Sequence, residues 1–257
     1  MRINEGMIIK SYEDIEKIQC YTPFRHSYYR GLSSMKHTLL PSLTRKIRCA
    51  EKARNAEKYI WEKISTNNII CDFFHYPIEE KTRQQEWELA LLCRHSGVLS
   101  RIMEFTPTTK IACWFAANEN GNEDGALWEM ILPESIRNRD AYEKFLTPCE
   151  IAGTNFFRSS IVSRGEESFN SMAERNSFHQ NAFCFVQSME DSVIPLEQQN
   201  LIQLIRHRIP ASSKQIIINT MKKFKVAQKY TDFVYAEDTI IKNEIDKINS
   251  EVLQKFT

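Results

Sequence analysis

The chain has 257 residues, of which 42% are hydrophobic and 26% are charged, a composition typical of a globular protein with a sizeable core. A net charge of +1 excludes a strong overall attraction to nucleic acid or to an anionic membrane, and leaves room only for a local basic patch. The low content of glycine (7) and proline (8) argues against long flexible linkers, so we expect one domain over residues 1–257.

The amino-terminal segment and the cysteines bear on the cellular compartment. The segment MRINEGMIIKSYEDIEK has neither the apolar run nor the small-residue cleavage site of a signal peptide. No stretch approaches the roughly 18 uninterrupted apolar residues that a membrane helix needs. The seven cysteines are scattered without a CxxC pair, which favours reduced thiols over a disulfide framework or a zinc site. We therefore expect a cytoplasmic protein with no membrane contact and no metal.

The first half of the chain predicts short strands and longer helices. Residues 7–19 predict a strand followed by a short acidic helix, and residues 27–33 predict a second strand. Pro41 suits a turn before an amphipathic helix over residues 45–68. A further helix over residues 82–96 has a glycine directly after it as a stop signal.

The second half continues the mixture of helices and strands. VLSRIMEF is short and apolar, as a buried strand or extended segment would be, and Thr106-Pro107 predicts a helix start before KIACWFAAN. NENGNEDG predicts a surface loop and ALWEMIL a strand. AFCFV (residues 182–186) and LIQLIRHRI predict two more strands, residues 211–226 a basic helix, and the last segment a short strand or turn with a helix. Because helices and strands mix without regular alternation, the sequence favours an α+β fold.

The common catalytic motifs are absent from the sequence. It contains no GxxxxGK[ST], GxGxxG, GxSxG or HExxH pattern, so the usual phosphate-loop, dinucleotide, hydrolase and zincin sites are not expected. The six histidines form no pair at the i, i+3 or i, i+4 spacing of helical metal ligands. What remains is a set of polar residues at the edges of apolar elements.

Each of these polar residues has a structural and a functional interpretation. Arg30, in YYRG, is either a strand-edge arginine paired with a carboxylate or a residue that holds an anion. His95 is either a satisfied histidine at a helix end or a site residue. Arg101 and Glu104 are either a structural ion pair or site residues, and Thr106 has a sufficient role as a helix cap.

Several segments together resemble the FRG-domain family, which is named for a Phe/Tyr-Arg-Gly motif. YYRGLSS followed by LLPSLTR resembles the family's opening, and RHSGVLSRIMEFT followed by PTTKIACWFA resembles its central run and the helix after it. The residues of the central run that match are His95, Gly97, Arg101 and Thr106. The residues that differ from the family pattern are Arg94, Leu99, Ser100, Glu104 and Phe105. ERNSFHQNAFCFV resembles a later family segment through Arg175, Gln180 and Phe183, and RIPASSKQIIINTM resembles the closing strand and helix. The resemblance implies a single FRG-like domain with its core from about residue 20 to about residue 245.

The order of the segments is also similar, more weakly, to that of ADP-ribosyltransferases. These enzymes have a Tyr-Arg-Gly strand, then a hydroxyl-bearing segment that leads into a helix, then a strand with a catalytic glutamate. The resemblance implies a central split β-sheet flanked by helices and NAD as substrate. The NAD-binding residues that it implies are Tyr29, Arg30, Gly31, Ser100, Arg101 and Thr106. The catalytic residues that it implies are Arg30, His95, Glu104 and Gln180.

One position departs from the transferase pattern in a way that matters for the chemistry. The expected glutamate falls on or near Gln180, and a neutral amide cannot stabilise a cation by charge. Glu104, close to Thr106, is the carboxylate that could supply the negative charge instead, with Glu174 as a lesser candidate.

The resemblance implies an ADP-ribosyltransferase of the toxin or anti-phage effector type, which modifies RNA, DNA or protein, with RNA such as mRNA favoured. Basic segments at residues 45–58 and 206–229 fit a nucleic-acid track or, equally, a solvated charged face. An antitoxin or chaperone partner is a further expectation. The alternatives are an NAD glycohydrolase, with water as acceptor, and a non-catalytic FRG module that binds a nucleotide, a nucleic acid or a protein.

Overall fold

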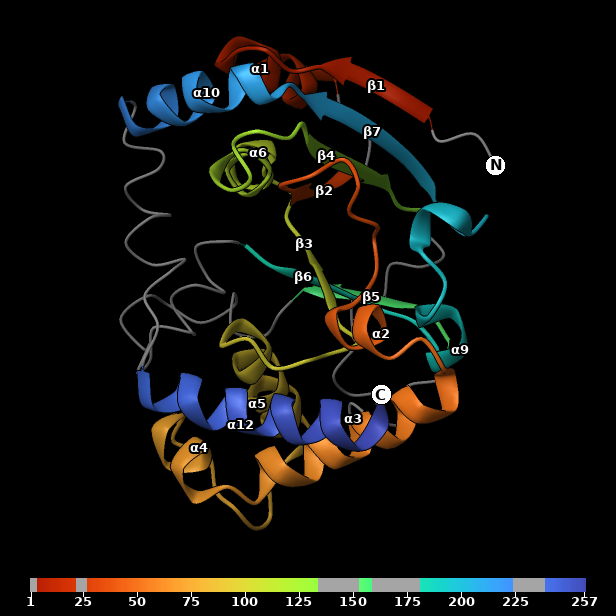
Figure 1. Cartoon of the computed structure of the whole chain (residues 1–257), viewed down its shortest axis with the longest axis vertical. Coiled ribbons are helices and arrows are strands. Elements are labelled where there is room, and N and C mark those ends of the chain that lie inside the picture. The colour runs from red at the N-terminus through yellow and green to blue at the C-terminus, as the bar shows by residue number, and fades with distance from the viewer. Residues whose placement is uncertain (1–3, 22–26, 134–152, 159–180, 224–238) are drawn as a thin grey trace. The chain divides into compact units, whose positions relative to one another are not determined.

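The structure is a computed structural model, and it describes residues 4–21, 27–133, 153–158, 181–223 and 239–257 (Figure 1). Its helices and mixed sheets confirm the α+β class. Contacts divide the chain into two compact units. The first unit consists of Met1–Leu39, Glu104–Arg137 and Pro195–Asp232, and the second of Leu40–Met103, Asn138–Ile194 and Phe233–Thr257.

The first unit is built on a four-stranded sheet in the order β1-β7-β4-β2. Its strands are β1 (Asn4–Ile8), β2 (Ser27–Leu32), β4 (Gly125–Ile131) and β7 (Gln203–Ile209). β1 runs parallel to β7, whereas β4 pairs antiparallel with both β7 and β2. Its helices are α1 (Tyr12–Tyr21), α6 (Thr109–Asn118) and α10 (Ala211–Lys223), with a short 3-10 helix, η5 (Leu196–Gln198).

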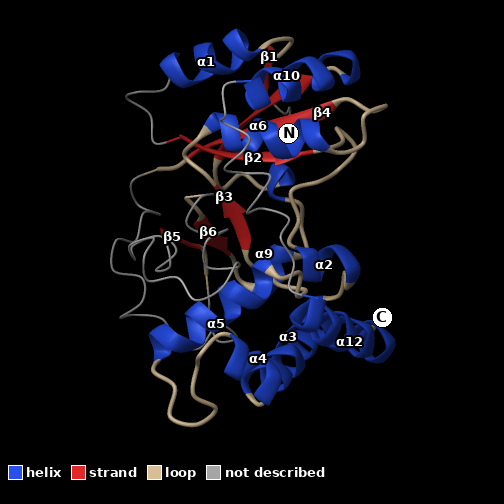
Figure 2. Ribbon diagram, turned by 90° about the vertical axis from the view of Figure 1, so that its left-hand side faces the viewer, coloured by secondary structure: helices blue, strands red, loops and turns tan. Residues whose placement is uncertain are grey.

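The helices of this unit cover one face of the sheet. Tyr29, Leu127 and Ile209 belong to one buried cluster with apolar residues of α1, α6 and α10. Figure 2 shows α6 next to β2 and β4. Because side chains alternate along a strand, Arg30 and Trp128 lie on the opposite face from this cluster. That face carries Arg30 and the pocket described below.

A buried lysine fixes the chain where α6 ends. Lys214 of α10 is 2% exposed. Its Nζ donates to the backbone oxygens of Ser33, Glu119 and Asn120, at 2.7, 2.9 and 3.0 Å. Burial lowers the pKa of Lys214, because the ammonium leaves water. One side chain thus satisfies carbonyls that follow β2 and α6, and it fixes the starting point of the segment 33–39.

The second unit is mainly helical. Its helices are α2 (Ser42–Lys46), α3 (Ala50–Ser65), α4 (Asn68–Phe73), α5 (Arg83–His95), α9 (Met189–Ser192) and α12 (Thr239–Phe256). β6 (Phe183–Val186) pairs antiparallel with β5 (Asn155–Arg158), in a three-stranded sheet of order β3-β6-β5. β3 (Met103–Phe105) begins in this unit and leads the chain into the first. In the core, Trp87 of α5 packs edge-on against Phe157, with ring centroids 5.3 Å apart.

Most predicted elements are confirmed, and the differences have local causes. The single helix predicted over 45–68 is interrupted, because Ile47 is extended after α2 and Asn67 caps a new helix, α4. α5 begins at the expected place, with a capping box between Thr82 and Gln85. β5, a strand of four residues, was not predicted.

The predicted helix start at Thr106 is wrong by a few residues. α6 begins at Thr109, with Thr108 at the N-cap position. The Thr106 N–H donates to the Tyr29 carbonyl at 2.9 Å, and the Thr106 carbonyl accepts from the Tyr29 N–H at 2.7 Å. Thr106 therefore extends the strand pairing beside β2, and its backbone cannot also begin a helix.

Candidate functional site

The YRG segment lies on β2 and is held directly against the segment around Thr106. The two Tyr29–Thr106 hydrogen bonds form an antiparallel bridge between positions far apart in the sequence. Arg30 is half-buried, and its Nη1 donates to the backbone oxygen of Glu104 at 2.6 Å. Four of the predicted site residues of the first unit, Tyr29, Arg30, Glu104 and Thr106, are thus brought together.

The two side chains from the Thr106 segment differ in exposure. Glu104 is half-buried, whereas Thr106 is 6% exposed and its Oγ1 accepts a hydrogen bond from the Thr108 N–H at 3.2 Å. This local bond fixes the turn between β3 and α6. The cluster therefore holds the Arg30 guanidinium against the backbone at Glu104, with a buried hydroxyl in the turn that follows.

Gly31 has a packing reason to be glycine. A Cβ at this position would lie 1.8 Å from the carbonyl oxygen of Ala112 and 2.7 Å from the nitrogen of Ala116. β2 therefore approaches the backbone of α6 more closely than any side chain allows. This contact accounts for the glycine of the motif without a ligand, and the NAD-binding role of Gly31 stays a prediction.

The other predicted site residues belong to the second unit or lie outside the described residues. His95 is half-buried in the last turn of α5. The Ser100 Oγ accepts from the Ile102 N–H at 3.0 Å, and the Ser42 Oγ accepts from the Ser100 N–H at 2.9 Å. Gln180 lies outside the described residues, as do three other positions singled out in the sequence: Glu174, Arg175 and His179.

Arg101 forms a buried ion pair, but not with Glu104. Its side chain is 2% exposed, and it bonds to Glu57 of α3 through Nη2–Oε2 at 2.9 Å and Nε–Oε1 at 3.1 Å. Its Nη1 donates to the carbonyl oxygen of Gln187 at 2.8 Å. Burial raises the pKa of Glu57, and the Arg101 guanidinium opposes that rise. These contacts favour the ion-pair interpretation of Arg101 and give it a partner that the sequence did not indicate.

A buried polar network crosses the helix-covered face of the first unit's sheet. Ser27 Oγ donates to Glu129 Oε1 at 2.7 Å, and Glu129 Oε2 lies 3.2 Å from Nε2 of His207. The Met7 N–H donates to Nδ1 of His207 at 3.0 Å, so Nε2 carries the proton that the carboxylate accepts. Because the carboxylate stands between serine and histidine, these residues form no nucleophile–base pair.

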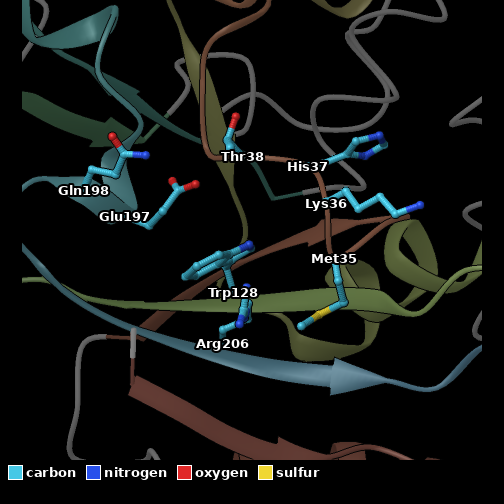
Figure 3. A pocket seen from close by; sticks show the side chains of 8 residues that line it. All are labelled: Met35, Lys36, His37, Thr38, Trp128, Glu197, Gln198 and Arg206. Carbon is cyan, nitrogen blue, oxygen red and sulfur yellow. The ribbon is translucent and has the colours of Figure 1, made fainter. Parts of the chain in front are cut away.

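A pocket that no sequence motif indicates lies on the opposite face of the same sheet. It has a volume of about 330 Å³ and is called here the Trp128 pocket (Figure 3). Its lining residues are Met35, Lys36, His37, Thr38, Trp128, Glu197, Gln198 and Arg206. Trp128 of β4 pairs in register with Arg30 of β2 and with Arg206 of β7, so the three side chains form one row across the sheet. An arginine inside a strand was the signal that singled out Arg30, and the same signal at Arg206 could have led to this pocket.

Comparison with known families gives one finding. Residues 25–125 match the family model described as the FRG domain. The chain carries an FRG domain. No curated protein and no solved structure matches the chain.

The FRG match covers the YRG strand and the segment from His95 through α6, and it ends where β4 begins. The resemblance noted further along the chain, around Gln180, therefore lies beyond the matched residues, as do Trp128 and Arg206. Within the described ranges, no group of three or more His, Cys, Asp or Glu residues is arranged to hold a metal ion. No helix among the described residues is long and apolar enough to cross a membrane.

Proposed function

We propose that this FRG-domain protein is an ADP-ribosyltransferase, a toxin or anti-phage effector that transfers ADP-ribose from NAD to a macromolecule, with RNA as the favoured acceptor. The observation that carries the proposal is the pairing of Tyr29 with Thr106, which joins the arginine strand to the hydroxyl-bearing segment. These are the first two segments in the transferase order. The coarser statement, that the chain has an FRG domain, stands without the proposal.

Arg30 is suited to hold the pyrophosphate of NAD. A guanidinium presents several N–H donors in a planar fork and binds two phosphate oxygens at once. The bond from Nη1 to the Glu104 carbonyl fixes the orientation of this fork before a ligand arrives. A group that is already oriented loses less conformational entropy on binding.

In the proposed reaction, Arg30 binds the phosphates and Glu104 stabilises the developing charge on the ribose. When the bond between C1′ of the ribose and the nicotinamide nitrogen breaks, the bonding electrons leave with nicotinamide and the ribose carries positive charge. A carboxylate near that centre stabilises the developing cation, and Glu104 is the carboxylate on the segment that Arg30 contacts. The acceptor then forms a bond to C1′ and releases a proton. Thr106 fixes the position of this segment through its backbone bonds to Tyr29.

The experiment that tests the proposal offers the full chain NAD labelled in its adenylate half, together with RNA, DNA or lysate protein in separate reactions. Label in RNA supports the transferase. Free ADP-ribose alone supports the glycohydrolase, and intact NAD with measurable binding supports a non-catalytic module. Growth arrest on expression of the protein supports the toxin interpretation.

Replacement of Arg30 by alanine tests the phosphate role. Hydrogen bonds to charged groups contribute about 1.5–3 kcal/mol each, so we expect kcat/KM for NAD consumption to fall about 10- to 150-fold. Arg83→Ala, at an exposed position of α5, is the matched control and should leave the rate unchanged. Equal rates for a folded Arg30→Ala protein and the wild type would contradict the role of Arg30.

A further inference from the structure

We propose that the Trp128 pocket binds a nucleobase and prefers guanine. This inference does not depend on ADP-ribosyl transfer, because it concerns binding at a different set of residues. The pocket, at about 330 Å³, falls at the small end of the range of about 300–1,000 Å³ that ligand sites occupy. All of the residues that line the pocket belong to the first unit.

Two buried donors at the pocket have no hydrogen-bond partner. They are Nε1 of Trp128 and Nε of Arg206. Trp128 is 1% exposed, so water does not solvate its N–H, and an unsatisfied buried donor costs about 1–3 kcal/mol. In Figure 3 the indole nitrogen lies at the end of the ring nearer the Met35–Thr38 segment. Two such donors at one pocket call for a ligand that brings hydrogen-bond acceptors.

A second tryptophan, Trp114, also has an indole N–H without a partner. Trp114 of α6 is also 1% exposed and its Nε1 also has no partner, but it does not line the pocket and belongs to the helix-packed core. One unsatisfied indole is therefore tolerated in this protein. The Trp128 pocket differs because the unsatisfied indole stands beside the unsatisfied Nε of Arg206, whose guanidinium carbon lies 5.7 Å from the centre of the Trp128 ring.

The charges around the pocket do not favour a phosphate. Lys36 forms an ion pair with Glu123 at 2.6 Å, and Arg206 forms one with Glu5. Glu197 adds a further carboxylate to the lining. Because each cation already has a partner, a strongly anionic ligand would meet no surplus of positive charge. A neutral ligand with acceptors on one edge and donors on another fits better.

Hydrogen bonds hold the rim of the pocket in place. The Leu39 N–H donates to Oε2 of Glu197 at 3.0 Å, and the Leu39 carbonyl accepts from the Leu196 N–H at 3.0 Å. At the other end of the segment, the Met35 N–H donates to the Asp124 carbonyl at 2.8 Å. The pocket is therefore formed before a ligand enters, and Oε1 of Glu197 is left to accept from it.

Guanine matches this arrangement more completely than the other bases. Its O6 and N7 are adjacent acceptors, of the kind that arginine binds, and they suit the N–H groups of Arg206 and Trp128. Its N1–H and amino group are adjacent donors, which suit the carboxylate of Glu197. Adenine has no O6 acceptor, and the pyrimidines have no N7. We therefore expect guanine to bind more tightly than the other bases.

The test measures binding to the full chain by isothermal titration calorimetry, without NAD. Guanosine, adenosine, cytidine and uridine are titrated separately, with inorganic phosphate as the anion control. We expect guanosine to bind about tenfold or more tightly than adenosine, since a good bidentate contact discriminates at that level. A further titration compares a single-stranded RNA of uracils that contains one guanine with an RNA of uracils alone. Tighter binding of the first RNA would show that the pocket accepts guanine within a chain as well as in a nucleoside.

Two variants locate the binding. Trp128→Phe removes the N–H and keeps an aromatic ring, and we expect it to weaken guanosine binding about tenfold, whereas Trp114→Phe, the matched control, leaves it unchanged. Glu197→Gln, at a half-buried rim position, should weaken guanosine more than cytidine. Equal effects of the two tryptophan variants would overturn the proposal. So would phosphate binding as tightly as guanosine, no preference for guanosine, or no nucleoside binding at millimolar concentration.

Discussion

Arg101→Met is expected to lower the free energy of unfolding by about 3–5 kcal/mol at pH 7, the cost of leaving one member of a buried ion pair without its partner. Arg101 is 2% exposed and the Glu57 side chain 14%, so water cannot replace the guanidinium. The substitution also removes the 2.8 Å hydrogen bond that Arg101 donates to the Gln187 carbonyl. Urea denaturation followed by tryptophan fluorescence measures the change. Arg54→Met is the matched control: Arg54 pairs with Glu190 on the surface, where a pair contributes about 0–1 kcal/mol.

The pH dependence of the Arg101→Met protein separates the lost charge partner from a simple packing defect. Burial already raises the pKa of Glu57 in the folded protein, and removal of Arg101 removes the largest interaction that opposes the rise. A carboxyl whose folded pKa exceeds its unfolded value makes folding more favourable at low pH and less favourable as the pH rises between the two values. The variant should therefore recover stability, relative to wild type, as the pH falls from 7 towards about 4.5. A constant deficit across this range would contradict the explanation.

A double variant tests the same pair without leaving a buried charge. Glu57→Leu with Arg101→Met replaces both ions by apolar side chains, and such replacements in other proteins are often neutral or stabilising. We expect the double variant to be more stable than Arg101→Met alone. If it is less stable, the Gln187 contact and the packing around Arg101 outweigh the ion pair.

The elements that the sequence predicted well are those set by local signals. α5 has a capping box at Thr82 and a glycine at its end, Gly97, whose φ of +102° suits no other residue. β4 and β7 are apolar runs next to turn-forming residues. The Thr106 helix start was wrong because a long-range backbone bridge to Tyr29 outweighed a local capping preference.

Among the candidate site residues, Arg30 and Thr106 are singled out by a family pattern, and the structure brings their two segments together through the Tyr29–Thr106 bridge. Their functional roles stay predictions. Trp128 and Arg206 lie far apart in the sequence and meet only through the strand order of the sheet. The Glu57 partner of Arg101 could not be predicted for the same reason, since it comes from a separate helix, α3. Pairings across a sheet or between helices depend on topology, which local patterns do not contain.

Gly31→Ala is expected to destabilise the protein by at least about 3 kcal/mol, at or beyond the upper end of the range for overpacked interiors. The added Cβ would lie 1.8 Å from the Ala112 carbonyl oxygen, far inside van der Waals contact, so β2 and α6 must move apart. Thermal and urea unfolding measure the loss. Gly121→Ala is the matched control: no atom lies within 4 Å of its added Cβ, and we expect no loss of stability.

The atom that blocks Gly31→Ala is a backbone oxygen of Ala112, so trimming the Ala112 side chain cannot make room. Gly31→Ala with Ala112→Gly should therefore be no more stable than Gly31→Ala alone, and about 1 kcal/mol less stable because glycine weakens a helix interior. Rescue by Ala112→Gly would show that β2 and α6 have room to slide. The glycine of the YRG motif would then need a reason other than packing, and contact with a ligand would be the first to test.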